Sequence, residues 1–223
     1  MKVAIMQPTY IPWVGYFAMM NSVDRFVILD HVQFSRRSWQ QRNRILSNGK
    51  EQLLSLSVRK ADRSTPINEI ELTEPNGNFG KHLKTIHQSY SKSEYFDLYY
   101  NDLLCLSNEV TSLCDLNVKL INYIKEQLSI ETELIFSSNL NVEGTKSELM
   151  FNICSKLGAT SYLSAMGSKE YMESESGFDF NKVSVEYFDY KPKSYPQGLN
   201  DFVPYMSALD LLFNVGTKSR LYL

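Results

Sequence analysis

Two polar loops near the start of the chain carry side chains suited to binding phosphates and sugars. The first begins at Gln7 and contains Tyr10 and Trp13, and its backbone is stiffened by Pro8 and Pro12. It is expected to open a helix, whose N-terminus offers free N–H groups and the positive end of a dipole to an anion. This pattern favours ligand binding, although the dinucleotide-binding G-x-G-x-x-G is absent. The alternative is a structural loop in which Trp13 fills the core.

The second loop covers residues 30–44, where four arginines alternate with Trp39 and three glutamines. Guanidinium groups bind phosphate or carboxylate oxygens in pairs, and glutamines hydrogen-bond sugar hydroxyls or amides. The same mixture can grip single-stranded nucleic acid. A formal net charge of −2 does not reinforce that function, so we expect no nucleic-acid partner. The alternative is an exposed basic loop.

Three residues are candidates for acid–base catalysis: Asp30, His82 and Glu148. Lys81 precedes His82 and could supply a positive charge to a bound substrate. The structural alternative is a solvated lysine beside a histidine with hydrogen-bond partners inside the protein. With three histidines, no H-E-x-x-H pattern and no cysteine cluster, the sequence predicts no metal site.

Further polar residues follow expected strands in the second half of the chain. Ser138, Ser164 and Tyr171 offer hydroxyl groups, and Gly167 allows a ligand to approach the backbone. Gln197 could close the pocket near the C-terminus, or could be an ordinary turn residue. No G-x-S-x-G pattern is present, which disfavours a serine hydrolase.

These loops need a scaffold that brings them to one edge. Short apolar runs at residues 3–6 and 25–29 predict strands that are buried on both faces and pair in parallel. Further strands are expected at 52–58, 67–72, 133–136, 161–164 and 183–187, and helices at 15–21, 79–90, most of 97–128, 145–157 and 207–214. Residues 31–44 are expected to be irregular.

Helix boundaries follow from three capping signals. Asp115 is a plausible N-cap, Thr145 and Glu148 match a capping box, and Gly158 is expected as a C-cap. The alternation of strands and helices predicts a three-layer α/β fold with a mainly parallel sheet. It would comprise a Rossmann-like, nucleotidyltransferase-like N-terminal unit and a helical insertion at about 79–128.

The composition places the chain among ordinary globular proteins. Its 223 residues, 43% hydrophobic and 22% charged, are enough for a single domain over 1–223. Three cysteines and no C-x-x-C pair disfavour a disulfide framework. No signal peptide and no apolar run of about 18 residues are found, so a cytoplasmic protein without a membrane span is expected.

The assembled segments resemble those of the WbqC-like protein family. They include Gln7-Pro8, Ser137-Ser138-Asn139-Leu140 and Tyr195-Pro196-Gln197. The matching stretches run almost end to end, over residues 7–17, 30–43, 81–84, 137–140, 157–164, 195–197 and 207–214. Members often have His before the Gln-Pro pair, where this chain has Met6, and many have Gly-Gly in place of Met166-Gly167. A role of that histidine therefore cannot pass to this chain.

The resemblance implies a bacterial protein of surface-polysaccharide, often O-antigen, gene clusters. The hypothesis that follows is an enzyme that modifies a nucleotide-activated amino sugar by N-acyl or aminoacyl transfer. Its substrate-binding residues would be Gln7, Tyr10, Trp13, Gln33, Arg37, Trp39, Arg42, Asn43, Lys81, Ser138, Ser164, Gly167, Tyr171 and Gln197.

Within this hypothesis, Arg37 and Arg42 hold the pyrophosphate. Trp13 and Trp39 stack on base or sugar, and Gln33 and Asn43 read the polar edges of the substrate. His82 or Asp30 takes the amine proton. Two alternatives stay open: an ATP-dependent ligase or nucleotidyltransferase, and a non-catalytic binding module in a glycan assembly complex. ATP and an acyl donor are candidate cosubstrates, no cofactor follows from the residues, and a homodimer is one option for assembly.

Overall fold

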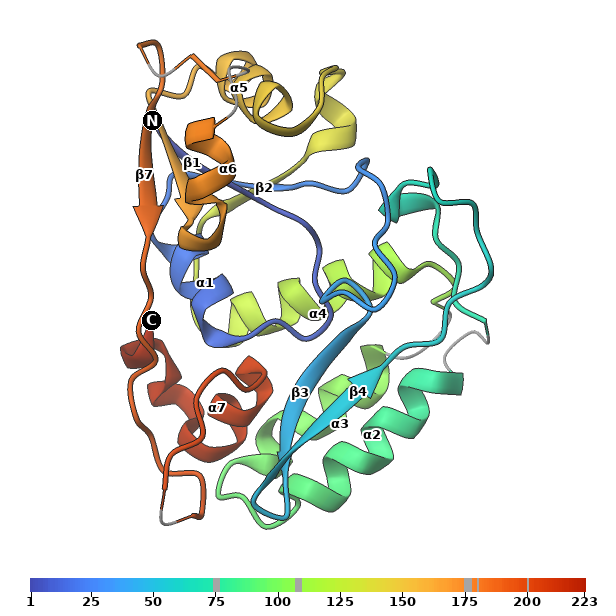
Figure 1. Cartoon of the computed structure of the whole chain (residues 1–223). Coiled ribbons are helices and arrows are strands. Elements are labelled where there is room, and N and C mark those ends of the chain that lie inside the picture. Colours follow the sequence, from blue (N-terminus) through green and yellow to red (C-terminus); the bar gives the residue numbers. More distant parts are fainter. Residues whose placement is uncertain (74–76, 107–109, 175–177, 180, 200) are drawn as a thin grey trace. The chain divides into compact units, whose positions relative to one another are not determined.

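A computed structural model of the chain describes residues 1–73, 77–106, 110–174, 178–179, 181–199 and 201–223 (Figure 1). The chain divides into two units that interleave along the sequence. The sheet unit comprises Met1–Gln7, Ala18–His31 and Glu131–Lys191. The helical unit comprises Pro8–Phe17, Val32–Ile130 and Pro192–Leu223. The description of residues 1–223 as a single domain stays a prediction.

The sheet unit is built on five strands in the order β5-β2-β1-β6-β7. Every neighbouring pair in this sheet is parallel. The strands are β1 (Lys2–Met6), β2 (Arg25–Ile28), β5 (Glu133–Phe136), β6 (Ser161–Ala165) and β7 (Ser184–Phe188). Parallel strands must be covered on both faces, and the buried apolar residues of β1 and β2 meet that requirement. The parallel pairing predicted for these two strands is confirmed.

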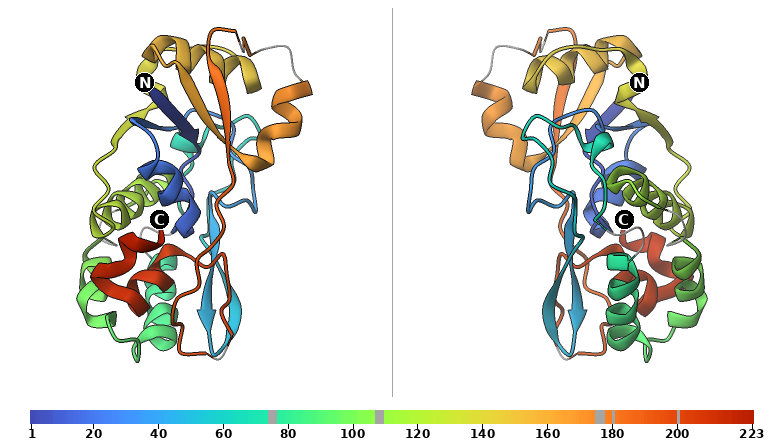
Figure 2. Two further views of the ribbon diagram at one scale, coloured as in Figure 1. Left: turned by 90° about the vertical axis from the view of Figure 1, so that its left-hand side faces the viewer. Right: turned by 90° about the vertical axis from the view of Figure 1, so that its right-hand side faces the viewer.

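Helices flank this sheet. Figure 2 shows α5 (Lys146–Leu157) and α6 (Lys169–Ser174) on opposite sides of it. The three-layer α/β class with a mainly parallel sheet is therefore confirmed. Short 3-10 helices, η2 (Ser137–Leu140) and η3 (Met166–Ser168), follow β5 and β6 directly. Helix α1 (Val14–Asn21) contains residues of both units.

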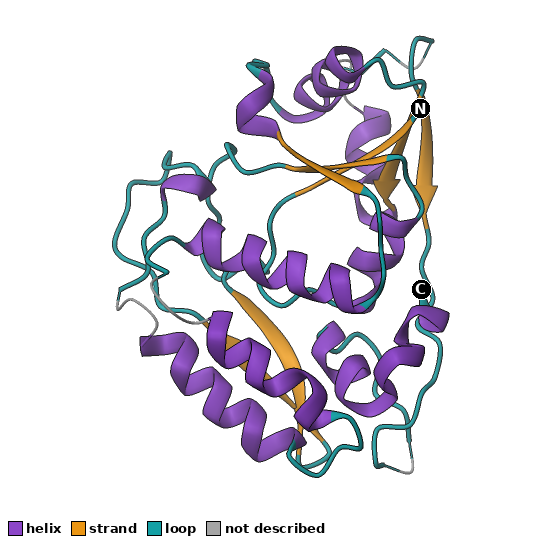
Figure 3. Ribbon diagram, turned by 180° about the vertical axis from the view of Figure 1, so that it is seen from behind, coloured by secondary structure: helices purple, strands orange, loops and turns teal. Residues whose placement is uncertain are grey.

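The helical unit surrounds an antiparallel hairpin of β3 (Arg42–Ser47) and β4 (Lys50–Ser55). Asn48 and Gly49 connect the two strands, both with positive φ, as a two-residue turn of the I′ kind requires. Helix α2 (Gly77–Tyr90) packs against β3 and against α3 (Phe96–Leu106). Figure 3 shows these helices beside the hairpin, and α4 (Leu113–Gln127), α7 (Ala208–Val215) and η4 (Gly216–Tyr222) complete the unit.

Several sequence-based expectations for local structure are wrong. Residues 67–72 do not form a strand, because Pro66 precedes a 3-10 helix, η1 (Ile67–Glu69). Glu71 and Leu72 make isolated bridges, to Ser112 and Val58. Residues 31–44 are not irregular throughout, because β3 begins at Arg42. The Asn-Gly pair after β3 is a hairpin signal that would have indicated this strand.

Of the three capping signals, one is wrong and a second gives the right position without its hydrogen bond. Ser112, not Asp115, caps α4, and its hydroxyl accepts a hydrogen bond from the Asp115 amide. Thr145 is the N-cap residue of α5, as predicted, but its side chain makes no capping hydrogen bond. Gly158 ends α5 in the left-handed conformation at φ 67°, as predicted.

Asn117 of α4 ties two loops of the helical unit together. Its side-chain amide donates to the carbonyl of Pro8 at 3.1 Å and to the carbonyl of Gln40 at 2.7 Å. The side chain is fully buried, and buried carbonyls need hydrogen-bond donors from within the protein. One amide group therefore fixes the start of the Pro8 loop and the turn before β3.

We predict that Asn117→Ala lowers the free energy of unfolding by about 2–4 kcal/mol, since two buried carbonyls lose their donors. Urea unfolding followed by circular dichroism measures the change. Asn152→Ala is the matched control, because Asn152 also donates to a backbone carbonyl, that of Glu143, but at an exposed position. Equal effects of the two substitutions would contradict a special role for the buried amide.

Candidate functional site

The order of the parallel strands reverses at one point of the five-stranded sheet. The chain proceeds from β1 to β2 and β5 on one side, and to β6 and β7 on the other. The order thus reverses between β1 and β6, and in open α/β sheets ligands bind outside the carboxyl ends of the strands at such a reversal. Gln7 follows β1 there, and η3 follows β6. We call this edge of the sheet unit the carboxyl edge.

Asp30 organises the carboxyl edge beside β2. Its side chain is 3% exposed, and a buried carboxylate needs hydrogen-bond donors. The Ser137 hydroxyl donates to Oδ1 at 2.9 Å, as does the Ser138 amide, also at 2.9 Å. The Ser138 hydroxyl donates to Oδ2 at 2.6 Å. The carboxylate thus fixes the first turn of η2 to the end of β2.

His31 is joined to this arrangement through Ser137. Its Nδ1 lies 2.6 Å from the Ser137 Oγ, which also accepts a hydrogen bond from the Asp30 amide at 3.2 Å. The ring is half-buried. Asp30, Ser137 and His31 therefore form a hydrogen-bonded chain that ends on an imidazole.

Beside β6, the polar side chains of the carboxyl edge form hydrogen bonds within the protein. The hydroxyls of Ser164 and Ser168 lie 2.6 Å apart, and the Ser168 hydroxyl donates to the Ala165 carbonyl at 2.7 Å. An added Cβ at Gly167 would meet no atom within 4 Å, so backbone is open to approach there. The Lys169 ammonium lies 5.6 Å from the centre of the Tyr187 ring, within range of a cation–π interaction.

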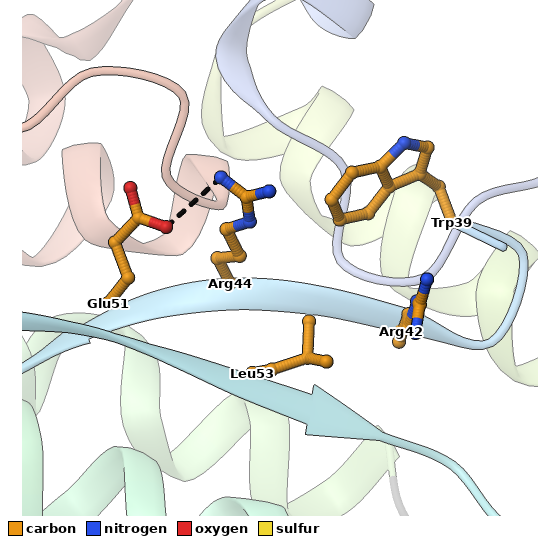
Figure 4. Close-up of a pocket in the computed structure, with 5 residues that line it drawn as sticks. All are labelled: Trp39, Arg42, Arg44, Glu51 and Leu53. Carbon is orange, nitrogen blue, oxygen red and sulfur yellow. Dashed lines mark hydrogen bonds and ion pairs between the residues drawn. The ribbon is translucent and has the colours of Figure 1, made fainter. Parts of the chain in front are cut away.

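The helical unit carries a second candidate site on the outer face of its hairpin. A cavity of about 290 Å³ is lined by Trp39, Arg42, Arg44, Glu51 and Leu53 (Figure 4). Arg42 and Arg44 are two apart on β3, so both side chains leave the same face of the strand. We call this cavity the hairpin pocket.

The two arginines of the hairpin pocket differ in their partners. The Arg44 guanidinium pairs with the Glu51 carboxylate at 3.0 Å and lies 5.3 Å from the centre of the Trp39 ring. Among the described residues, the Arg42 guanidinium has no hydrogen-bond or ion-pair partner. Trp39 is 47% exposed, a large fraction for an indole ring. The hairpin pocket therefore offers an uncommitted cation beside a partly exposed aromatic ring.

His82 of α2 has a different environment. The Tyr10 hydroxyl lies 2.8 Å from its Nδ1, and the ring also hydrogen-bonds the backbone of Ser55. Burial lowers the pKa of His82 to about 4, because the charged imidazolium would lose its hydration. His82 is therefore neutral at pH 7 and occupied by partners within the helical unit.

The Pro8 loop is likewise held by internal contacts. The Asn43 amide donates to the carbonyls of Tyr10 and Ile11, both at 3.0 Å. The Trp13 ring lies so close to Gly15 that a Cβ there would be 2.2 Å from it. Gly15 is thus required for the packing of Trp13. The Trp13 ring also contacts Tyr205, at 5.4 Å between ring centroids.

The sequence matches the model of one known protein family. The model of the WbqC-like protein family matches residues 7–222. The chain belongs to the WbqC-like protein family. The resemblance seen in the sequence motifs is thereby confirmed.

One curated relative supports the assignment over the full length. The chain is 34% identical to the uncharacterized protein Rv1507c of Mycobacterium tuberculosis (strain ATCC 25618 / H37Rv) over 225 residues. The match covers 100% of this chain and 97% of the relative. No solved structure gives a significant match. None of the helices described in this WbqC-like chain is both long and apolar enough to cross a bilayer.

The predicted site residues of this WbqC-like chain fall into two groups. Those of the sheet unit are Gln7, Asp30, Ser138, Glu148, Ser164, Gly167 and Tyr171. Those of the helical unit are Tyr10, Trp13, Gln33, Arg37, Trp39, Arg42, Asn43, Lys81, His82 and Gln197.

Only some members of each group lie together. The structure joins Asp30 to Ser138, and it places Trp39 with Arg42 in the hairpin pocket. Gln197 instead donates to the buried carboxylate of Asp210 at 2.7 Å. Glu148 is exposed in the first turn of α5.

The remaining predicted residues are exposed or outside the described part. Gln33, Arg37 and Lys81 are exposed, and the side chain of Tyr171 lies outside the described residues. The sequence-based selection missed His31, Ser137 and Arg44. His31 follows Asp30 directly, and its position after an apolar strand was the available signal.

The lowered pKa of His82 predicts a pH-dependent stability. In the unfolded chain the histidine takes up a proton near pH 6.5, whereas the folded chain resists it down to about pH 4. The stabilisation from neutral His82 is complete above pH 6.5 and is lost as the pH falls towards 4. Between pH 7 and pH 5 the loss should be about 2 kcal/mol.

Urea unfolding at a series of pH values measures this loss. His82→Gln should flatten the dependence, because a glutamine oxygen can accept from Tyr10 without titrating. His87→Gln, on the same helix but exposed and packed against Phe96 and Tyr100, should leave the His82 contribution in place. A slope that survives His82→Gln unchanged would show that another group causes it.

Proposed function

We propose that this WbqC-like protein is an enzyme of bacterial surface-polysaccharide biosynthesis that acts on a nucleotide-activated amino sugar. The reaction is N-acyl or aminoacyl transfer to the amino group of the sugar. The observation that carries the proposal is the uncommitted guanidinium of Arg42 beside the partly exposed ring of Trp39 in the hairpin pocket.

The chemistry of that pocket suits a nucleoside diphosphate. A guanidinium binds phosphate oxygens in pairs, and such charge-assisted hydrogen bonds are stronger than neutral ones. The exposed indole of Trp39 provides a flat surface on which a base stacks. A free Arg42 is available for phosphate, since an arginine already paired would have to break that pair first.

The second cation of the pocket would serve the ligand differently. Arg44 is neutralised by Glu51 and positioned over Trp39, so it would hold the ring in place rather than bind a phosphate alone. The Glu51 carboxylate is partly exposed and can accept hydrogen bonds from sugar hydroxyls. The hairpin pocket thus combines acceptors, a cation and an aromatic face, the three groups that a nucleotide sugar needs.

Internal hydrogen bonds change the roles that the sequence suggested for two further residues. Asn43 is occupied by the Pro8 loop and would position that loop rather than read the substrate. His82 is occupied by Tyr10 and Ser55, which favours a structural role over that of a base. Exposed Arg37 remains a proposed contact of the pyrophosphate, and exposed Glu148 a proposed catalytic carboxylate. A cytoplasmic location and a homodimer also belong to the proposal.

An ATP-dependent ligase or nucleotidyltransferase is the second candidate, because a triphosphate would satisfy the same unpaired Arg42. The two differ in the ligand that binds. A sugar-modifying transferase binds the nucleotide sugar and obtains its acyl group elsewhere, whereas a ligase binds ATP and releases pyrophosphate or phosphate. A non-catalytic glycan-assembly module would bind neither.

We predict that calorimetric titration with a thymidine diphosphate amino sugar shows binding, with little binding of ATP. Arg42→Ala should weaken the affinity at least about tenfold, since a hydrogen bond to a charged group contributes about 1.5–3 kcal/mol. Trp39→Ala should weaken it to a similar extent through loss of stacking.

Arg59→Ala is the matched control. It removes the same charge from the same unit, but Arg59 is exposed and already paired with Glu71 at 3.3 Å. It should leave the affinity nearly unchanged. An Arg42→Ala variant that binds as well as the wild type would rule out the phosphate role of the hairpin pocket, and binding of ATP alone would favour the ligase.

A further inference from the structure

We propose that Glu51 is the residue by which the hairpin pocket selects an amino sugar over a hydroxyl sugar, by accepting a hydrogen bond from the ammonium group of the ligand. The inference rests on the proposed function for the nucleotide part of the ligand. It goes beyond that function because it assigns the recognition of the amine to one carboxylate. All the residues involved belong to the helical unit.

The register of the hairpin places the charged side chains of the pocket on one face. Arg44 lies opposite Leu53, and Leu46 lies opposite Glu51. Directly opposite residues share a face of a sheet, and so do residues two apart on one strand. Arg42, Arg44 and Glu51 therefore leave the hairpin on the same face.

The charges of this face follow a fixed order along the hairpin. Figure 4 shows Arg44 between Arg42 and Glu51. Oε2 of Glu51 lies 3.0 Å from the guanidinium of Arg44, so the middle cation already has a partner. Lys50, the neighbour of Glu51, leaves the other face of β4 and does not line the pocket. The pocket thus has a positive end at Arg42 and a negative end at Glu51.

Both ends of the pocket keep hydrogen-bonding capacity for a ligand. Both oxygens of a carboxylate accept hydrogen bonds, and Arg44 uses only Oε2 of Glu51. Among the described residues, Oε1 of Glu51 has no partner, as is the case for the guanidinium of Arg42. The Glu51 side chain is 46% exposed, so a ligand can reach Oε1 from solvent.

A ligand that fits this order of charges carries an anion and a cation at separate points. A nucleotide-activated amino sugar does so, because its diphosphate is negative and its protonated amine is positive. With the diphosphate at Arg42, the sugar ring lies over the exposed side chain of Leu53, and the ammonium donates to Oε1 of Glu51. A hydroxyl in place of the amine would donate without a charge, and charge-assisted hydrogen bonds are about twice as strong when both groups are ionised.

Calorimetric titration with two ligands tests the role of Glu51. The ligands are a thymidine diphosphate amino sugar and thymidine diphosphate glucose, which has a hydroxyl in place of the amine. The pH is one at which the amine is protonated, as an NMR titration of the free ligand establishes. The wild type should bind the amino sugar about three- to tenfold more tightly, since solvent weakens a charge-assisted hydrogen bond at a half-exposed carboxylate. Glu51→Gln keeps the shape of the side chain without its charge and should abolish this preference.

The two ligands should respond to Glu51→Gln in different directions. The amino sugar should bind more weakly, because its ammonium loses a carboxylate. Thymidine diphosphate glucose should bind at least as tightly as it does to the wild type, because Arg44 loses its partner and becomes available to the diphosphate. A hairpin damaged by the substitution would instead weaken the binding of both ligands.

Two further variants separate the ends of the pocket. Arg42→Ala should weaken the binding of both ligands to the same extent and keep the preference for the amine. Glu71→Gln is the matched control, because it removes the same charge from another exposed carboxylate of the helical unit, which is paired with Arg59 at 3.3 Å. It should change neither affinity.

A preference for the amino sugar that survives Glu51→Gln overturns the role of Glu51. A wild type that binds both sugars equally well, or a Glu51→Gln variant that loses affinity for both, overturns it as well. In these cases nucleotide-sugar binding is still observed, and the proposed function stands. Binding of neither ligand by the wild type overturns the proposed function and the role of Glu51 together.

Discussion

The parallel pairing of β2 with β5 is the constraint on which the carboxyl edge depends. The register places Ile28 opposite Phe136. Asp30 and Ser138 each follow two residues later, so they leave their strands at the same level. The Ser138 amide and hydroxyl can therefore both reach the carboxylate. A slip of one residue would turn the side chains to the other face of the sheet and separate this pair.

The buried carboxylate of Asp30 depends on this pairing, because its hydrogen-bond donors follow β5. An unpaired charge in this position would be very costly, and its three donors all come from one short turn. The same principle operates in the helical unit at Asp210, which accepts from Tyr195 and Gln197 at 2.7 Å. Burial raises the pKa of Asp210, and these donors oppose that rise. In both units a buried acid orders the loop that supplies its donors.

The sequence predicts the strands and helices that have a regular apolar pattern. It does not predict the local structures that depend on tertiary contacts. The apolar runs of β1 and β2 have no other stable location than a buried parallel sheet, so their pairing follows from the sequence. The capping box at Thr145 has the right residues, yet its hydrogen bond does not form. The apolar pattern of residues 67–72 fits a strand, yet Pro66 directs the chain into η1. In both segments the local sequence pattern is present, but tertiary packing determines the structure that forms.

The candidate sites show a related limit, because residue type does not reveal remaining hydrogen-bonding capacity. His82 and Asn43 have the right chemistry for a substrate site, but internal partners occupy both. Among the described residues, the guanidinium of Arg42 and the Nε2 of His31 have no hydrogen-bond partner. Contacts between residues distant in sequence separate these groups from the occupied ones. Ser137 is 106 residues from His31, yet its hydroxyl lies 2.6 Å from Nδ1 of that ring. A reactive group is therefore recognised by what its neighbours leave unsatisfied, a property that exists only once the strands have paired.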